Sequence, residues 1–268
     1  MGIDIGTTSV KAVAADADGR VVARTRVPHK LLVPAADRME HDANQAWRRG
    51  PVKALRTLGV EPAAASVVAM VPSLTAVDRR GIPRTPGLLY GDARGGFADP
   101  GEAAGFLAWT AAEAPDAHGY WPAQAVANKA LGGESVMDTS AAASHMPVFS
   151  LDTFAWNPSL GVDVSRFPRV GGMGEAVAKL AGGGVLDAGG VDAVGEQLVA
   201  GADQPGDVLV MCGTTLIVWS VAPEWTEVDG LVTVPHMAAS GGQFIGGASN
   251  VGGLFLNWAT GLAGRSTR

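Results

Sequence analysis

The sequence predicts an α/β fold, and three observations support this prediction. Segments of alternating apolar and polar residues are interspersed with segments of helical period, and strands that alternate with helices are typical of α/β domains. A strand–turn–strand pattern built on Gly-Thr-Thr occurs twice, within residues 2–15 and 207–221. Apolar residues make up 47% of the chain and charged residues 17%, so a sizeable core is available and extended disorder is excluded.

Residues 2–30 predict three strands joined by two tight turns. Apolar and polar side chains alternate over residues 2–5 and again over 9–15, on either side of the first Gly-Thr-Thr turn. Glycine suits such a turn because it tolerates positive φ. A second turn at Asp18-Gly19 leads into a third strand over 20–27.

The rest of the chain alternates between helical and strand-like segments. A helix is expected over 42–59, with Asp42 as its cap and Gly59 as its stop. A short buried strand is expected over 65–71. Four further helical segments are expected over residues 99–114, 120–132, 174–182 and 193–201.

Charge and composition exclude several classes of protein. The net charge is −6 and Lys/Arg clusters are no longer than a pair, which argues against a nucleic-acid partner. Cys212 is the only cysteine, so neither an internal disulfide nor a thiolate zinc site is expected, as in a reducing cytoplasm. We expect no signal peptide before the first strand, and the most apolar run, 208–222, is too short and interrupted to span a membrane. The sequence therefore predicts a soluble cytoplasmic protein with no nucleic-acid or membrane partner.

The two Gly-Thr-Thr turns predict a phosphate site. Consecutive backbone N–H groups at a glycine turn form an anion-binding concavity, and neighbouring hydroxyls add donors. Asp4, two residues before the first turn, would then hold a hydrated magnesium ion that bridges the phosphates. We expect the turns at two hairpin tips that point into one cleft, and two unrelated hairpins are the alternative. The residues of the two turns are Gly6, Thr7 and Thr8, and Gly213, Thr214 and Thr215.

Several segments resemble, in the correct order along the chain, the motifs of the FGGY carbohydrate kinases. "GIDIGTTSVKA" looks like the first phosphate motif of the actin-like ATPase superfamily, which sugar kinases share with actin and heat-shock chaperones. The segments that narrow the resemblance to FGGY kinases are "RMEHDANQAW", "IPRTPGLLYGDARG", "GGESVMDTSAAAS" and "GGVDAVGEQLVAGADQPGDVLVMCGTT". Their ordered occurrence over nearly the whole chain is specific to this family.

The resemblance implies an actin-like ATPase fold of the ribonuclease H-like kind, a mixed sheet flanked by helices. It implies a sugar-binding domain with the first phosphate turn over 1–203, and the beginning of a nucleotide-binding domain over 204–268. Family members are much longer, so the chain looks truncated and its second domain incomplete. We therefore expect the chain alone to bind sugar weakly and to turn over little ATP. Apolar surface should be exposed in the second domain, where a second copy or a missing C-terminal portion would cover it.

The resemblance also implies a reaction and the residues that perform it. The reaction is transfer of the ATP γ-phosphate to a hydroxyl of a sugar or polyol, with ATP and Mg²⁺ as cofactors. Asp192 is the candidate base that accepts the hydroxyl proton, and capping of the helix that it opens is the alternative. Glu40, Asp92 and Arg94 lie in segments that would line the sugar cleft, with Asp92 accepting hydrogen bonds from hydroxyls. A solvated turn pair is the alternative for Asp92 and Arg94, and a surface acid for Glu40.

Departures from the family pattern leave the substrate open. Met70-Val71-Pro72 stands where glycerol kinases carry Gln-Arg-Glu and xylulokinases Gln-Met-His, so neither substrate follows. Asp138 and Ser140 are expected to satisfy backbone groups near a helix end, Trp258 to pack in a core, and no histidine has metal-ligand spacing. Three alternatives are an actin-like filament or chaperone ATPase, a non-catalytic sugar-binding regulator, and a decayed gene product of the same fold.

Overall fold

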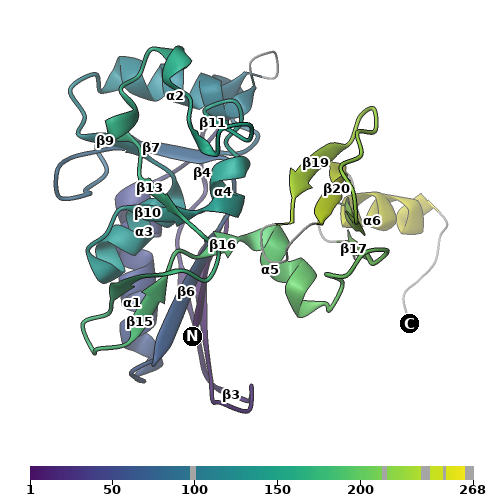
Figure 1. Ribbon diagram of the computed structural model, residues 1–268, viewed down its shortest axis with the longest axis horizontal. Helices are drawn as coiled ribbons and strands as arrows, with labels where there is room; N and C mark the ends of the chain where they lie inside the picture. The colour runs from purple at the N-terminus through teal and green to yellow at the C-terminus, as the bar shows by residue number, and fades with distance from the viewer. Residues whose placement is uncertain (97–100, 213–215, 237–241, 250–251, 263–268) are drawn as a thin grey trace. The chain divides into compact units, whose positions relative to one another are not determined.

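The computed structural model describes residues 1–96, 101–212, 216–236, 242–249 and 252–262 (Figure 1). The chain divides into two compact units, Met1–Asp192 and Ala193–Arg268. This division precedes the domain boundary expected after residue 203. Within the described residues, no helix is long and apolar enough to cross a membrane.

A seven-stranded mixed sheet forms the centre of the first unit. Its strand order is β14-β15-β6-β1-β2-β3, and the short strand β16 pairs with β6 on the edge that β15 also uses. The strands β1, β15 and β16 run parallel to β6, whereas the remaining pairs are antiparallel. The seven strands are β1 (Gly2–Ile5), β2 (Ser9–Ala15), β3 (Val21–Pro28), β6 (Ala64–Ala69), β14 (Ala176–Lys179), β15 (Val185–Asp187) and β16 (Gly190–Val191).

A second, antiparallel sheet of five strands completes the first unit, in the order β4-β5-β8-β7-β9. Its strands are β4 (Leu32–Ala35), β5 (Arg38–His41), β8 (Gly87–Leu89), β7 (Ser73–Val77) and β9 (Gly119–Trp121). The shorter elements of the unit are α4 (Thr139–Ala143), the strand pairs β10 (Val136–Asp138) with β13 (Arg169–Gly171) and β11 (Phe149–Ser150) with β12 (Ala155–Trp156), and the 3₁₀ turns η2 (Ala93–Gly95), η3 (Pro158–Leu160) and η4 (Val164–Arg166).

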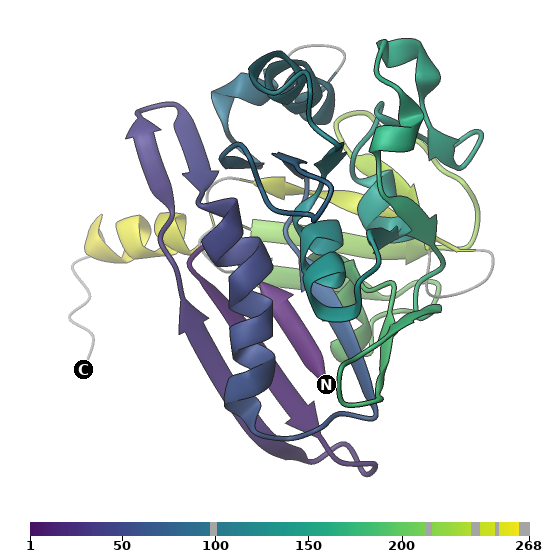
Figure 2. The ribbon, with the colours of Figure 1, turned by 90° about the vertical axis from the view of Figure 1, so that its left-hand side faces the viewer.

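Helices bury the apolar side chains of both sheets. A π-helical segment, η1 (Asn44–Arg49), continues into α1 (Gly50–Leu58), which lies across β2 and β3 (Figure 2). On the main sheet α3 (Ala123–Gly132) packs against β6, and α2 (Glu102–Glu113) packs against β7 of the second sheet. One apolar cluster joins the main sheet to Val77, Leu89 and Trp121 of the second sheet, and Trp47 of η1 is fully buried in it. A second cluster joins other residues of the second sheet to α2.

Most of the predicted elements are confirmed, and one is wrong. The helix expected over 42–59 occurs as η1 and α1, and Gly59 ends it in a left-handed conformation with φ of 67°. The segment 174–182, expected to be helical, instead contains the edge strand β14. Its alanines favour a helix, but intrinsic propensity is a weak preference, and antiparallel pairing with β15 overrides it.

The second unit contains a four-stranded antiparallel sheet in the order β17-β18-β20-β19. Its elements are α5 (Asp192–Val199, whose first residue belongs to the first unit), β17 (Val208–Cys212), β18 (Leu216–Ala222), β19 (Val232–Pro235), β20 (Gln243–Ser249) and α6 (Gly253–Leu262). The expected exposure of apolar side chains in this unit is confirmed, because Val208 and Val210 of β17 are 57% and 60% exposed. Trp258 of α6 is 61% exposed, so the prediction that it packs in a core is wrong.

Candidate functional site

Three parallel strands of the main sheet end in register at one edge. Ile5 of β1 and Val191 of β16 both pair with Ala69 of β6, from opposite sides. The residues that follow these strands are therefore neighbours at this edge: Gly6 after β1, Met70 after β6 and Asp192 after β16. Two inter-strand spacings separate the outer strands by about 10 Å. The sheet thus brings the first Gly-Thr-Thr turn and Asp192 to the same side of the first unit.

The first Gly-Thr-Thr turn joins β1 and β2 as a tight hairpin, as predicted. The Gly6 N–H group donates to the Ser9 carbonyl at 3.1 Å. The carbonyls of Thr7 and Thr8 accept hydrogen bonds from elsewhere in the unit: Thr7 from the ring of His41 at 2.8 Å, and Thr8 from the backbone N–H of His29 at 3.0 Å. The turn's carbonyl oxygens are therefore occupied by protein donors.

Asp4 lies beside this turn. A Cβ atom added at Gly6 would stand 3.8 Å from Asp4 Oδ2, so the absent side chain leaves space next to the carboxylate. Gly6 itself does not have a positive φ, and that expected reason for the glycine is wrong. Lys11 contacts Asp4 Oδ2 at 3.2 Å. Magnesium usually keeps several waters and takes one or two carboxylates, so this single, partly exposed carboxylate beside the turn fits a water-mediated site.

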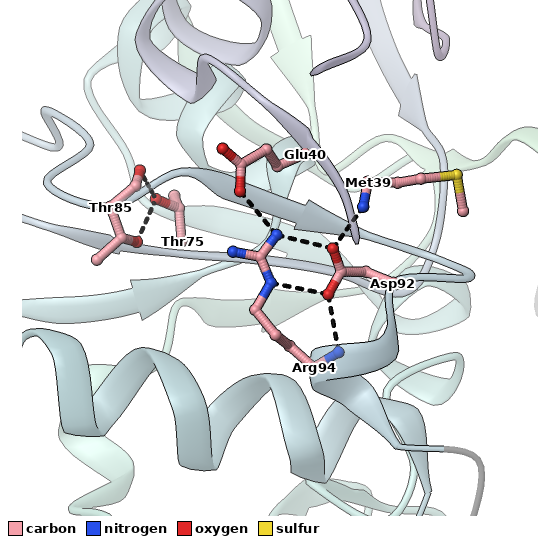
Figure 3. Close-up of polar contacts among 6 residues, drawn as sticks. All are labelled: Met39, Glu40, Thr75, Thr85, Asp92 and Arg94. Atoms are coloured by element: carbon pink, nitrogen blue, oxygen red, sulfur yellow. Dashed lines mark hydrogen bonds and ion pairs between the residues drawn. The ribbon is translucent and has the colours of Figure 1, made fainter. Parts of the chain in front are cut away.

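Glu40, Asp92 and Arg94 come together in one buried cluster (Figure 3). The Arg94 guanidinium donates from Nε to Asp92 Oδ1 at 2.8 Å, and from Nη2 to Asp92 Oδ2 and Glu40 Oε2, both at 2.7 Å. The side chains of Asp92, Arg94 and Glu40 are 0%, 7% and 14% exposed. This burial rules out the solvated turn pair and the ordinary surface acid.

Asp92 uses its full acceptor capacity inside the protein. Besides the two guanidinium bonds, Oδ1 accepts from the Arg94 N–H at 2.9 Å and Oδ2 from the Met39 N–H at 2.6 Å. A carboxylate has about four lone-pair sites, and these four bonds occupy them. Burial raises the pKa of Asp92, but the Arg94 and Met39 hydrogen bonds outweigh it and hold that pKa below its ordinary value. The geometry makes Asp92 the support of Arg94, and its contact with a sugar hydroxyl stays a prediction.

Arg94 is held as a fixed cation. Its hydrogen bonds with Asp92 raise its pKa, burial opposes this, and the bond with Glu40 adds to the rise. The guanidinium lies 4.7 Å from the centre of the Trp109 ring, a cation–π arrangement that suits arginine. Arg94 therefore stays charged and oriented at every physiological pH.

Tyr90 links this cluster to the phosphate turn. It follows β8, two residues before Asp92, and its hydroxyl lies 3.2 Å from Thr7 Oγ1. Within β5, Glu40 and His41 are adjacent, and Glu40 contacts Arg94 while His41 contacts the Thr7 carbonyl. The structure thus joins the predicted sugar residues to the first predicted phosphate turn through two short connections.

Asp192 follows a strand that side chains hold in place. Gln124 of α3 donates to the carbonyls of Gly190 and Val67, at 2.9 and 3.0 Å. The Val191 N–H donates to Ser140 Oγ at 3.1 Å. These side chains serve the backbone of β16 as a neighbouring strand would. Sequence patterns alone gave no reason to select Gln124, because a helical glutamine is usually exposed.

Asp138 and Ser140 have the structural role that was predicted. Asp138 caps α4 by accepting from the N–H groups of Ser140 and Ala141, and it also accepts from the Ser140 hydroxyl at 2.6 Å. Burial raises the pKa of Asp138, and these hydrogen bonds oppose the rise. The pair therefore fixes the hydroxyl that receives the Val191 N–H group.

Gly213, Thr214 and Thr215 fall outside the described residues, so the prediction of two facing phosphate turns stays a prediction. A polar cavity of about 390 Å³ lies at the Val77 end of β7, and none of the predicted site residues lines it. Among the residues that the structure describes, no group of three or more His, Cys, Asp or Glu side chains could hold a metal ion directly.

Comparison with known proteins bears on this geometry. Residues 1–61 match the model of the N-terminal domain of the FGGY family of carbohydrate kinases. The resemblance to FGGY carbohydrate kinases is confirmed. A search of the curated proteins gives no match to the chain.

Several solved kinase structures have the same fold as this chain. The xylulose kinase from Rhodospirillum rubrum has a TM-score of 0.85 at 22% identity, over 97% of this chain and 63% of that one. The gluconate kinase from Lactobacillus acidophilus has a TM-score of 0.82 at 19% identity, over 96% and 61%. The Plasmodium falciparum glycerol kinase with ADP has a TM-score of 0.81 at 13% identity, over 98% and 64%. The fold that the resemblance implies is thereby confirmed as the fold of these kinases, and the chain spans less than two thirds of each of them.

Proposed function

We propose that this chain forms the sugar-binding side and the first phosphate turn of an ATP-dependent carbohydrate kinase of the cytoplasm. One observation carries the proposal: the Gly6 turn and Asp192 follow parallel strands that both pair with Ala69. The two strands are separated by about 10 Å, with β6 between them, so a sugar hydroxyl and a terminal phosphate have room beyond the strand ends, between Asp192 and the turn. The match to the FGGY kinases over residues 1–61 supports the same reaction.

In the proposed mechanism the protein contributes position and charge. Asp192 accepts the proton of the attacking sugar hydroxyl. The hydroxyl oxygen bonds to the γ-phosphorus, and the bond from that phosphorus to the leaving ADP oxygen breaks. The N–H groups and hydroxyls of the turn hold phosphate oxygens, and Asp4 would hold a hydrated magnesium ion through water. Mg²⁺ neutralises phosphate charge when bound. Phosphoryl transfer relies mainly on such positioning and neutralisation.

The sugar side of the proposal rests on Arg94 and Glu40. A guanidinium has five N–H donors in a fixed plane, and Asp92 and Trp109 keep that plane in one orientation. Glu40 supplies carboxylate oxygens at the more exposed end of the cluster. Alternating donors and acceptors of this kind suit the vicinal hydroxyls of a sugar or polyol. The similar solved kinases are named for xylulose, gluconate and glycerol, three polyhydroxy compounds, which supports this substrate class.

A non-catalytic sugar-binding protein is the second candidate. The buried Glu40–Arg94–Asp92 cluster would serve it equally well, but a phosphate turn beside Asp4 would have no purpose. An actin-like filament or chaperone ATPase is disfavoured for the opposite reason, since it has no use for a buried acid–arginine cluster next to the turn.

Calorimetric titration of the purified chain with sugars, polyols and Mg²⁺·ATP separates these candidates. Glu40→Gln should weaken binding of the preferred sugar about 10-fold, the loss of a charge-assisted hydrogen bond, and leave Mg²⁺·ATP binding unchanged. Gly6→Ala should weaken Mg²⁺·ATP binding and leave sugar binding unchanged, because its methyl group enters the space beside Asp4 without a close clash. Glu61→Gln, at an exposed position, is the matched control. Sugar binding without any Mg²⁺·ATP binding would favour the non-catalytic candidate.

A further inference from the structure

His41 is a fully buried histidine whose ring contacts the first Gly-Thr-Thr turn. It ends β5, and its neighbour Glu40 belongs to the acid–arginine cluster. Successive side chains of a strand point to opposite faces, so one strand serves the cluster on one face and the turn on the other. His41 Nε2 lies 2.8 Å from the Thr7 carbonyl oxygen, and Trp47 Nε1 lies 2.9 Å from His41 Nδ1.

The two partners of His41 fix its protonation state. The indole N–H of Trp47 can only donate, so Nδ1 of His41 must be the acceptor. The Thr7 carbonyl can only accept, so Nε2 must carry the proton and donate. The ring is therefore the neutral Nε2–H tautomer, held between an indole and a peptide carbonyl. Both Trp47 and His41 are fully buried, so water does not compete for these bonds.

Holding the Thr7 carbonyl determines where the next N–H group points. The Thr7–Thr8 peptide bond is trans, and in a trans peptide the C=O and the following N–H point in opposite directions. A Thr7 carbonyl directed at His41 therefore turns the Thr8 N–H away from the protein interior. The backbone N–H of His29 holds the next carbonyl of the turn, by donating to Thr8 O at 3.0 Å.

We propose that His41 is a positioning residue for phosphate binding: it holds the Thr7 carbonyl and thereby directs the Thr8 N–H at a bound phosphate oxygen. The inference rests on the proposed kinase function. A rotated Thr7–Thr8 peptide would present a carbonyl oxygen to the phosphates instead of a donor, and like partial charges would repel. Trp47 acts one step further back, by keeping the donating nitrogen of His41 toward the turn.

Substitution at position 41 gives the sharpest test. His41→Leu fills the site with an apolar side chain and removes the donor, whereas His41→Gln keeps an amide N–H that can reach the carbonyl. The probe is Mg²⁺·ATP, with magnesium tripolyphosphate as a second probe that has no adenine. We expect His41→Leu to weaken both at least about 10-fold and His41→Gln to weaken them by less than about 3-fold. Affinity for the preferred sugar should stay unchanged in both variants. His118→Leu, at an exposed histidine, is the matched control.

Nuclear magnetic resonance provides a readout that a purely structural role would not move. In the wild type, the His41 ring should show a protonated Nε2 and an unprotonated Nδ1, and tripolyphosphate should shift the Thr8 amide. Trp47→Phe keeps the ring of His41 but removes its donor partner, so it serves if His41→Leu fails to fold. In Trp47→Phe both neutral tautomers of His41 should be populated, and Mg²⁺·ATP binding should weaken about 3-fold or more.

The possible failures are distinguishable. Wild-type protein that binds no Mg²⁺·ATP would overturn the proposed function itself. Wild-type affinity in a folded His41→Leu variant, or an unshifted Thr8 amide on tripolyphosphate binding, would overturn only the role of His41. Equal loss in His41→Leu and His41→Gln, together with weakened sugar binding, would make His41 a general packing residue and would also overturn it.

Discussion

Gly6 and Asp192 each follow a parallel strand whose last residue pairs with Ala69 of β6. Nothing in the local sequence at either position requires this, since 186 residues separate them along the chain. The parallel register alone brings the predicted phosphate turn and the predicted base to one edge of the sheet. Ligands of open α/β sheets commonly bind outside the carboxyl ends of parallel strands, and this edge has that position.

Ser140→Ala should loosen the strand that leads to Asp192. The change removes the acceptor of the Val191 N–H group and one donor to Asp138. Leaving a buried N–H without a partner costs about 1–3 kcal/mol. We expect urea unfolding to show that loss, and amide hydrogen exchange to show faster exchange at Val191. Ser159→Ala is the control, because Ser159 is exposed, and it should change the free energy of unfolding by less than about 0.5 kcal/mol.

Arg94→Lys should be strongly destabilising although it keeps the charge. A lysine has no planar fork, so it cannot hold both oxygens of Asp92 and reach Glu40 as well. Asp92 would keep its burial and lose the two guanidinium bonds among its four hydrogen bonds, which costs about 3 kcal/mol. The matched control is Arg169→Lys, whose exposed pair with Glu175 should contribute less than about 1 kcal/mol. Equal effects of the two changes on urea unfolding would contradict the buried-cluster interpretation.

His41 should make the first unit sensitive to acid. Burial lowers the pKa of His41 to about 4, the Thr7 carbonyl opposes this, and the charge of His29 adds to the lowering. The unfolded chain titrates near its ordinary value of about 6.5. Stability from the neutral ring is therefore complete above about pH 6.5 and is lost as the pH falls toward 4. At 1.36 kcal/mol per pKa unit, the loss is about 3 kcal/mol.

Comparison with His41→Gln isolates this contribution from that of other groups. Burial also lowers the pKa of His145, which adds to acid sensitivity, and it raises the pKa of Asp138, which opposes it. Both groups remain in the variant. Between pH 6.5 and 4 the free energy of unfolding should fall about 3 kcal/mol more in the wild type than in His41→Gln. Parallel curves would mean that His41 is not neutral in the folded protein.

The first three strands and β6 could be predicted from local patterns, whereas the sugar-site residues followed from the family resemblance. The alternation around the first Gly-Thr-Thr turn specifies a hairpin, and β1 and β2 form it. Glu40, Asp92 and Arg94 were selected through the family resemblance, and the structure gathers them in one cluster.

Features that depend on long-range pairing could not be predicted. The edge strand β14 was taken for a helix because its alanines carry no strong strand signal and its partner β15 comes later in the chain. His41 ends β5 and Trp47 lies in the π-helical segment η1 that follows it, so no single strand or helix period predicts their hydrogen bond. In the sequence Gln124 looks like any other helical glutamine, and only the structure shows that its side chain donates to the Gly190 carbonyl of β16.

The most direct test of the account is transfer of labelled γ-phosphate from ATP to a sugar in a single turnover, with protein in excess over ATP. With protein in excess, each bound ATP reacts at most once, so even slow phosphate transfer by the chain alone can be measured. We expect the label to move to the sugar that binds in calorimetry, and Asp192→Asn to slow that transfer about 10²-fold or more with sugar affinity nearly unchanged. Glu61→Gln, at an exposed position, should transfer at the wild-type rate. Label released as inorganic phosphate whatever the sugar, or transfer at the wild-type rate by Asp192→Asn, would contradict the account.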